Sequence, residues 1–276
     1  MGDWQSTFSQ GYSAPAHFPC TPDSAAHTKG PWAGFAAPAS GVGLNLRLSS
    51  WAYYSTPRTI IFDVGVGESG SQIVLIPDMI FSPSHFGSGE YLTRIHTMDI
   101  NIPIYVPNSK IWTRAQSSLA GHTLQGWVEP TVIKYGGQPC GSVCTAYGIS
   151  TATSLGTLVT AGNGDNVSGS WTQITDSCER IRAFLVACNS GTTSHTAFAN
   201  QWSTFDVAVG PPGQEVIILT PAEGSSSSAT TGVPMPPFLG PYVIDIKAGS
   251  RISIRLRVQH AGSSQRSRYF TIYGIR

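Results

Sequence analysis

One motif occurs twice in this chain and constrains its architecture more than any other feature. The stretch FDVGVGESGSQIVLIP occupies residues 62–77, and FDVAVGPPGQEVIILTP occupies residues 205–221. Aligning Asp63 with Asp206 gives an offset of 143, the difference between the two numbers. The same offset pairs the turn glycines, Gly67 with Gly210 and Gly70 with Gly213. A motif repeated at this separation predicts two copies of one structural unit.

Two further matches stand in the same order along the chain. The block VPNSKIWTRAQ from Val106 aligns with KAGSRISIRLR from Lys247 at an offset of 141. The segment KGPW ending at Trp32 aligns with SGSW ending at Trp171 at an offset of 139. Three ordered matches whose offsets differ by only a few residues indicate a tandem duplication of one domain.

The repeated segments have the pattern of β-strands joined by tight turns. GESGS and GPPGQ carry the Gly and Pro that a hairpin requires, because Gly tolerates positive φ and Pro presets its own φ. Polar and apolar residues alternate over 251–258, which predicts one core face and one face toward solvent or an interface. Residues 176–188 begin like a helix, but we interpret them as a turn followed by a strand. The sequence therefore predicts an all-β protein with two tandem duplicated β-sandwich domains of jelly-roll type.

The matches divide the chain into four segments. We predict an extended N-terminal arm at 1–23, β-sandwich domains at 24–135 and 160–276, and a linker at 136–159 that could instead add an edge strand. The arm is too polar to fold alone, so it is expected to lie on a surface of its own domain or of a neighbour. Its aromatic residues, the candidates for an assembly contact, are Trp4, Phe8, Tyr12 and Phe18.

Charged residues are scarce and balanced. The chain has 16 Lys plus Arg against 15 Asp plus Glu, and 11% of its residues are charged. This balance argues against a nucleic-acid partner and removes the electrostatic case for a membrane. The first residues lack the basic flank and apolar run of a secretory signal, and no stretch is long and apolar enough to span a membrane. We therefore expect a protein made in the cytoplasm.

No group of residues predicts catalysis or a metal site. Asp63 and Asp206 lie in mid-strand of separate domains, so we expect them to satisfy turn amides or to face solvent. The GNGDNVSG stretch at 162–169 lacks the terminal Glu of a calcium loop. The seven histidines form no spaced pair, and the five cysteines indicate thiols more than disulfides or zinc ligands. We predict no catalytic residue, no metal and no cofactor.

Tryptophans are the remaining candidates for a contact or ligand site. Trp32 and Trp171 occupy equivalent positions, and we expect each to plug its own sandwich. Trp112, Trp127 and Trp202 have no counterpart in the other copy. These three are therefore candidates for an interface or for ligand binding.

The series GxW, then FDVAVG with a Gly turn, then a hydrophobic strand leading into AGSRI and RxQ resembles β-sandwich virion proteins of tailed bacteriophages. Both copies carry the series, although the first has PNSKI in place of AGSRI. The resemblance implies a non-enzymatic structural component of the virion, such as a head decoration, collar, adaptor, fibre or spike. It implies other virion proteins as partners and self-association as a trimer or higher ring. A trimer of duplicated domains would present six similar units, which suits a six-fold particle axis.

Two other functional classes stay open. A carbohydrate-binding adhesin or receptor-binding module is the alternative, and its partner would be a glycan of the host surface. An enzyme is the third class, and it would require a cleft lined by two carboxylates at a suitable separation.

Overall fold

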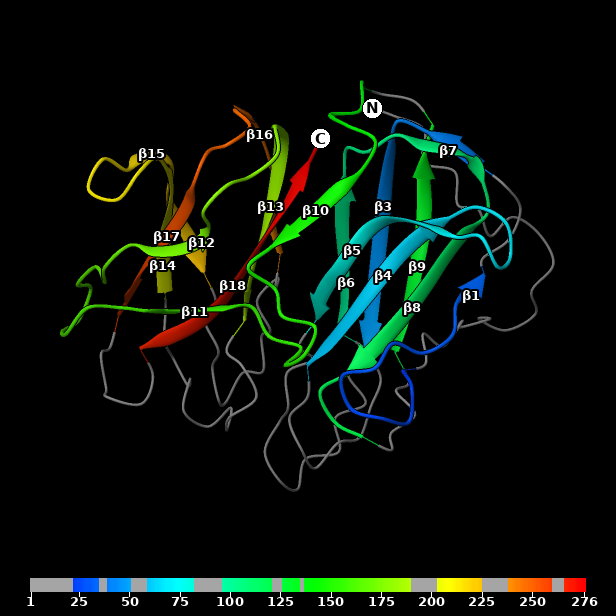
Figure 1. Cartoon of the computed structure of the whole chain (residues 1–276), viewed down its shortest axis with the longest axis horizontal. Coiled ribbons are helices and arrows are strands. Elements are labelled where there is room, and N and C mark those ends of the chain that lie inside the picture. The colour runs from blue at the N-terminus through cyan, green and yellow to red at the C-terminus, as the bar shows by residue number, and fades with distance from the viewer. Residues whose placement is uncertain are drawn as a thin grey trace.

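The computed structural model describes residues 22–34, 39–50, 59–81, 96–120, 126–134, 137–189, 203–224, 238–259 and 266–276. Every regular element among them is a β-strand, which confirms the all-β prediction (Figure 1). In the described part of the chain, no helix has the length and apolarity needed to cross a membrane.

The first sandwich consists of two antiparallel sheets and a short strand pair. Its first sheet has the order β1 (Ala33–Gly34), β8 (Ile111–Ser117), β4 (Ile60–Val66) and β5 (Ile73–Phe81). Its second sheet has the order β6 (His96–Ile102), β3 (Gly43–Ser50) and β9 (Gly126–Ile133). The short pair joins β2 (Ala39–Gly41) and β7 (Val106–Ser109). Apolar residues of both sheets share one buried core.

The second sandwich repeats this plan. Its first sheet has the order β12 (Thr172–Thr175), β17 (Ile252–Val258), β14 (Ser203–Val209) and β15 (Val216–Gly224). Its second sheet has the order β10 (Cys144–Tyr147), β18 (Ser267–Ile275), β13 (Ile181–Asn189) and β16 (Phe238–Ile246), and β11 (Thr157–Thr160) also pairs with β18. The order β1-β8-β4-β5 thus corresponds to β12-β17-β14-β15, and β6-β3-β9 corresponds to β16-β13-β18.

Several local predictions are confirmed by these elements. The two predicted hairpins are present, and their turn glycines have the positive φ that the turns require, with values of 129° at Gly67 and 120° at Gly210. The four apolar residues of β17 are buried in the core of the second sandwich. Residues 176–188 form a short connection followed by β13. The connector at 136–159 contributes β10 and β11 to a sheet, and the domain boundaries placed around it stay predictions.

The two sandwiches pack side by side, and they use different strands for the contact (Figure 1). The edge strands β5 and β6 of the first sandwich contact β10 and β16 of the second. Apolar residues on the outer side of the second sandwich, such as Leu185 and Ile275, belong to the same buried cluster as the core of the first sandwich. The Tyr273 hydroxyl, fully buried, accepts a hydrogen bond from the backbone N–H of Ile80 at 2.9 Å and donates one to the carbonyl of Asp78 at 2.8 Å. The sandwiches are therefore joined by a shared core.

Candidate functional site

The repeated aspartates are the most deeply buried charged residues of the two hairpins. Asp63 on β4 and Asp206 on β14 each have 0% exposure. Because their neighbours Phe62 and Val64 point into the core of the first sandwich, Asp63 points to the outer face of its sheet. Of the two alternatives expected for these acids, facing solvent is wrong, since each is covered by cationic side chains, whereas Asp63 does accept a hydrogen bond from a backbone amide, that of Asp78.

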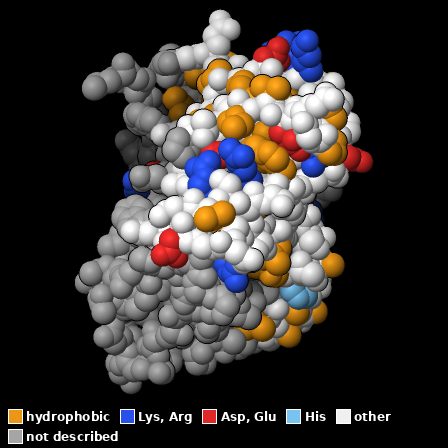
Figure 2. All heavy atoms as spheres, turned by 90° about the vertical axis from the view of Figure 1, so that its left-hand side faces the viewer, with side chains coloured by type: hydrophobic (Ala, Val, Ile, Leu, Met, Phe, Trp, Pro, Cys, Tyr) orange, Lys and Arg blue, Asp and Glu red, His pale blue; other side chains and the backbone are white. Residues whose placement is uncertain are grey.

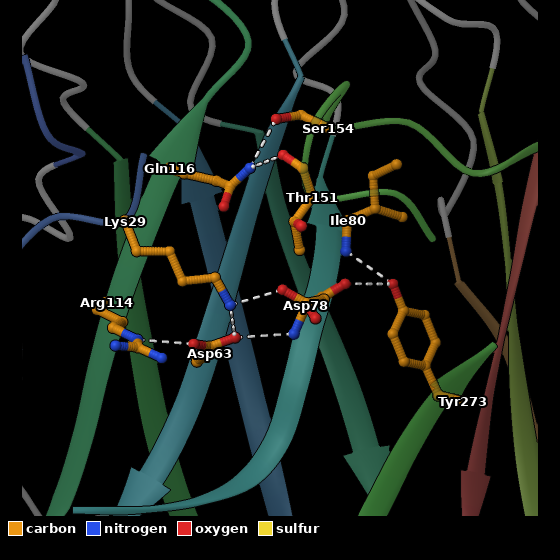
Figure 3. A network of polar contacts seen from close by, with 9 residues as sticks. All are labelled: Lys29, Asp63, Asp78, Ile80, Arg114, Gln116, Thr151, Ser154 and Tyr273. Atoms are coloured by element: carbon orange, nitrogen blue, oxygen red, sulfur yellow. Dashed lines mark hydrogen bonds and ion pairs between the residues drawn. The ribbon is translucent and has the colours of Figure 1, made fainter. Parts of the chain in front are cut away.

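The first of these sites, here called the first clasp, consists of Asp63, Arg114, Lys29 and Trp32, and Figure 3 shows the first three. The Arg114 Nε donates to Asp63 Oδ2 at 2.7 Å, and its guanidinium lies 4.5 Å from the centre of the Trp32 ring. Lys29 Nζ binds the other oxygen of Asp63 and also Asp78 Oδ1 at 2.6 Å. The backbone N–H of Asp78 donates to Asp63 at 2.9 Å. Both carboxylates are thereby paired with cations.

The second clasp is built on Asp206 in the same way. Arg255, on the adjacent strand, donates to Asp206 Oδ2 at 2.6 Å and lies 4.6 Å from the centre of the Trp171 ring. Arg257 binds the same carboxylate oxygen, and the Thr220 hydroxyl donates to the other. In both copies the Trp lies under an Arg on the outer face of the sheet, so the expectation that it plugs the sandwich is wrong.

The second cation of each clasp comes from a different element. In the first clasp it is Lys29, whose equivalent in the second copy is Ser168 at the same offset of 139 that relates the tryptophans. In the second clasp it is Arg257, whose equivalent in the first copy is Gln116 at an offset of 141. Ser168 accepts a hydrogen bond from Arg257 Nε at 2.6 Å. In each copy, therefore, two cations pair with the buried carboxylate. One cation is the equivalent Arg in both copies, and the other comes from a different position in each copy.

A β-bulge lies opposite the aspartate in both copies. In each hairpin one residue of the first strand, the aspartate, faces two residues of the second strand. The flanking register pairs are Phe62 with Met79 and Val64 with Ile76 in the first copy, and Phe205 with Ala222 and Val207 with Leu219 in the second. All of these pairs agree with the offset of 143, so the duplication extends to the irregularities of the sheet.

A serine and a histidine meet at the edge of the first clasp, and sequence reasoning missed them. His27 Nδ1 lies 2.9 Å from Ser154 Oγ, across a separation of 127 residues. Gln116 Nε2 also donates to Ser154 Oγ at 3.0 Å and to the Thr151 carbonyl at 2.7 Å (Figure 3). Ser154 is fully buried and has a φ of 55°. Its hydroxyl is enclosed by hydrogen-bond partners, so the group fastens the connector to the first sandwich.

Chemically, the clasps fasten segments to a sheet. Both oxygens of each carboxylate accept hydrogen bonds from donors on neighbouring segments, which fixes the orientation of the side chain. The first clasp ties residues 29–32 to β4, β5 and β8, and the second ties residues 168–171 to β14 and β17. Among the described residues, no group of three His, Cys, Asp or Glu side chains is placed to hold a metal ion.

The predicted contact residues are distributed unevenly over the described chain. Trp112 is half-buried, its Nε1 donates to the Gly67 carbonyl at 2.7 Å, and its ring packs directly over Gly34. Trp127 lies in β9, and its side chain is outside the described part. The other predicted contact residues, which lie outside the described residues, are Trp4, Phe8, Tyr12, Phe18 and Trp202.

A second candidate site is an edge of the second sandwich. Val66, Leu75 and Ile76 of the first sandwich are buried, with 5%, 5% and 0% exposure. Their equivalents at the offset of 143 are only partly buried, as are Tyr242 and Ile244 of β16. These five residues, here called the open edge, are Val209, Ile218, Leu219, Tyr242 and Ile244.

The different burial follows from the packing of the sandwiches. On one side of the second sandwich, β12 contacts β18 and β11 contacts β17. The strands β15 and β16 lie at the other ends of the two sheets, so they form the opposite side. The corresponding strands of the first sandwich, β5 and β6, are covered by the second sandwich. At the start of β15, Val216 and Ile217 are 64% and 40% exposed. Figure 2 shows apolar and basic side chains next to one another on the outer end of the second sandwich.

Comparisons with known proteins concern the fold. No protein-family model and no curated protein matches the sequence. A solved structure of PNGF-II matches with a TM-score of 0.39 and 9% identity. The match covers 89% of this chain and 59% of that one. PNGase F, described as a glycosylasparaginase from Flavobacterium meningosepticum, matches with a TM-score of 0.33 and 10% identity over 100% of this chain and 94% of that one. Infectious bursal disease virus, Gx strain, matches with a TM-score of 0.23 and 10% identity over 87% of this chain and 58% of that one.

One prediction is corrected by these likenesses. The sequence was interpreted as that of a protein that is not an enzyme, yet solved structures similar to this chain include PNGF-II and the glycosylasparaginase PNGase F. The exclusion of enzymes therefore does not stand. At 9% to 12% identity, and with TM-scores of 0.39 and 0.34, these likenesses assign no activity to this chain.

Proposed function

We propose that this chain is a structural component of a tailed-phage virion that assembles through its β-sandwiches and its N-terminal arm. The observation that supports this most directly is the open edge of the second sandwich. There, core residues such as Ile218 and Leu219 reach the surface, although their equivalents in the first sandwich are buried. Contiguous apolar surface of this kind marks contact sites for other proteins.

The rest of the molecule suits a part that is held between neighbours. The shared core and the Tyr273 hydrogen bonds make the two sandwiches one unit, and the clasps fasten the segments on its outer faces. Its low charge content, 11% of residues, leaves a surface with few groups that would be costly to desolvate at a contact. The resemblance of both copies to β-sandwich virion proteins supports the same role.

Immunogold electron microscopy tests this proposal. Antibodies raised against the purified chain would be applied to gradient-purified particles from infected cells, with preimmune serum as the control. The proposal predicts gold at one defined position on the particle. Unlabelled particles beside abundant chain in the soluble fraction of the same lysate would contradict it.

A further inference from the structure

The open edge is built like a site that receives β-structure. In the first sandwich the same side, formed by β5 and β6, is closed by the second sandwich. In the second sandwich, β15 is the last strand of its sheet, and none of the described strands pairs with its outer side. An edge strand with free backbone groups beside exposed aliphatic side chains is the arrangement that accepts an added strand.

A sheet face of a second copy is a poor match for the open edge. One face available on the first sandwich is the outer side of β6-β3-β9, and most of its described side chains are polar. Of the side chains that the structure describes on this face, Asn45 donates to Asn101 at 2.8 Å, and Arg47 pairs with Asp99 at 3.0 Å. By contrast, the outer face that closes the first sandwich is apolar, with Ala183, Leu185, Ala187, Tyr273 and Ile275 buried.

The N-terminal arm has the pattern that the open edge requires. Its four aromatic residues, Trp4, Phe8, Tyr12 and Phe18, all stand at even positions. In an extended chain successive side chains point to opposite faces, so all four would lie on one face. The odd positions from 3 to 19 carry mostly Ser, Thr, Gln, Asp, Gly and Pro. An extended arm would thus have one aromatic side and one polar side.

We propose that the open edge of the second sandwich binds the N-terminal arm of a second copy of this chain. The arm adds as a strand beside β15 and places its aromatic face against Ile218, Leu219 and Tyr242. The backbone groups of β15 then gain partners, and the half-exposed core becomes covered as it is in the first sandwich. This inference rests on the proposed function, because it names the partner through which the chain assembles.

The arm joins the first sandwich, whereas the open edge belongs to the second sandwich. The described chain starts at residue 22, and the first clasp fastens Lys29 to the first sandwich. Figure 1 places this dark blue segment at the lower side of the first sandwich, whereas β15 lies at the upper left of the second. An arm that leaves one sandwich and enters the other sandwich of the next copy makes a head-to-tail contact, which closes into a ring when the rotation allows it.

Light scattering on the full-length chain tests the proposal. The arm variant replaces all four aromatic residues by Ser, and the edge variant is Val216→Lys. Ile73→Lys is the matched control, because Ile73 is the equivalent residue of the first hairpin and is 70% exposed against 64% for Val216. We expect an oligomer for the wild type and for Ile73→Lys, and self-association at least tenfold weaker for the arm and edge variants. Melting curves check that each variant is folded.

A synthetic peptide of residues 1–21 provides a second readout. Titrated into the arm variant, the peptide should bind, and the same peptide with Ser at its aromatic positions should not. A monomeric wild type at all concentrations overturns the proposal even when the peptide binds, because the arm then covers its own edge. An arm variant that still forms the wild-type oligomer, or equal effects of Val216→Lys and Ile73→Lys, also overturns it. Failure of the virion role alone would leave these results intact, since no particle is involved.

Discussion

Because the second cation comes from different positions in the two clasps, moving it from one position to the other should change the free energy of unfolding in a predictable way. Arg257→Gln installs the residue that the first copy has at this position, and Ser168→Lys installs the lysine. Arg257 is 24% exposed and binds the fully buried Asp206 as well as Ser168. Hydrogen bonds to charged groups contribute about 1.5 to 3 kcal/mol, and partial exposure places this loss at about 2 kcal/mol.

The double variant shows whether the lysine at position 168 can replace the arginine at position 257, or whether the two substitutions lower the stability independently. Ser168→Lys alone adds a third cation beside Arg255 and Arg257, which should cost about 0.5 kcal/mol. In the double variant the new lysine replaces the missing cation, as Lys29 serves Asp63. We therefore expect a favourable coupling free energy of about 1 to 2 kcal/mol.

Differential scanning calorimetry measures these differences. For domains of this size about 1 kcal/mol corresponds to about 2 to 4 °C in Tm, so Arg257→Gln should lower Tm by about 4 to 8 °C and the double variant by clearly less. Arg180→Gln is the matched control, because Arg180 and its partner Asp245 are both exposed, and its Tm should stay close to that of the wild type. If the double variant loses the sum of the two single losses, the exchange argument is refuted.

Three further results are expected. Tyr273→Phe leaves the Ile80 N–H and the Asp78 carbonyl without their partner, so it should cost about 1 to 3 kcal/mol in urea unfolding, and an unchanged midpoint would contradict the bridging role. Burial raises the pKa of Cys144 from 9.0 to about 12, so its stabilising effect is present below pH 9.0 and is lost as the pH rises toward 12. Between pH 9.0 and about 12, the urea midpoint should therefore fall less steeply for Cys144→Ala than for the wild type. Gly70→Ala and Gly213→Ala, at φ of 88° and 80°, should each cost about 1 kcal/mol, whereas Gly137→Ala, where no positive φ is required, should be near neutral in the same assay.

The repeat made much of the fold predictable. Hairpins follow from apolar runs around Gly-rich turns, and the alternation from Ile252 to Val258 identified the core face of β17 correctly. Asp63, Arg114 and Trp32 were each matched to their counterparts in the sequence. Their assembly into one clasp was not predicted, because strands β4 and β8 become neighbours only through the sheet order.

The remaining features depend on tertiary packing. Ile218 and Leu75 occupy equivalent positions in similar apolar strands, so nothing local indicates that one is half-exposed and the other buried. The second sandwich covers only one of these edges, and that asymmetry is a property of the packed chain. Likewise, His27 and Ser154 meet across 127 residues without any motif that joins them.

The copy number of the chain in purified particles tests the central claim most directly. Quantitative mass spectrometry with isotope-labelled peptides of this chain would be calibrated against the major protein of the same particles. A structural role predicts a fixed ratio that survives repeated gradient purification. A ratio that falls toward zero with each round of purification would contradict it.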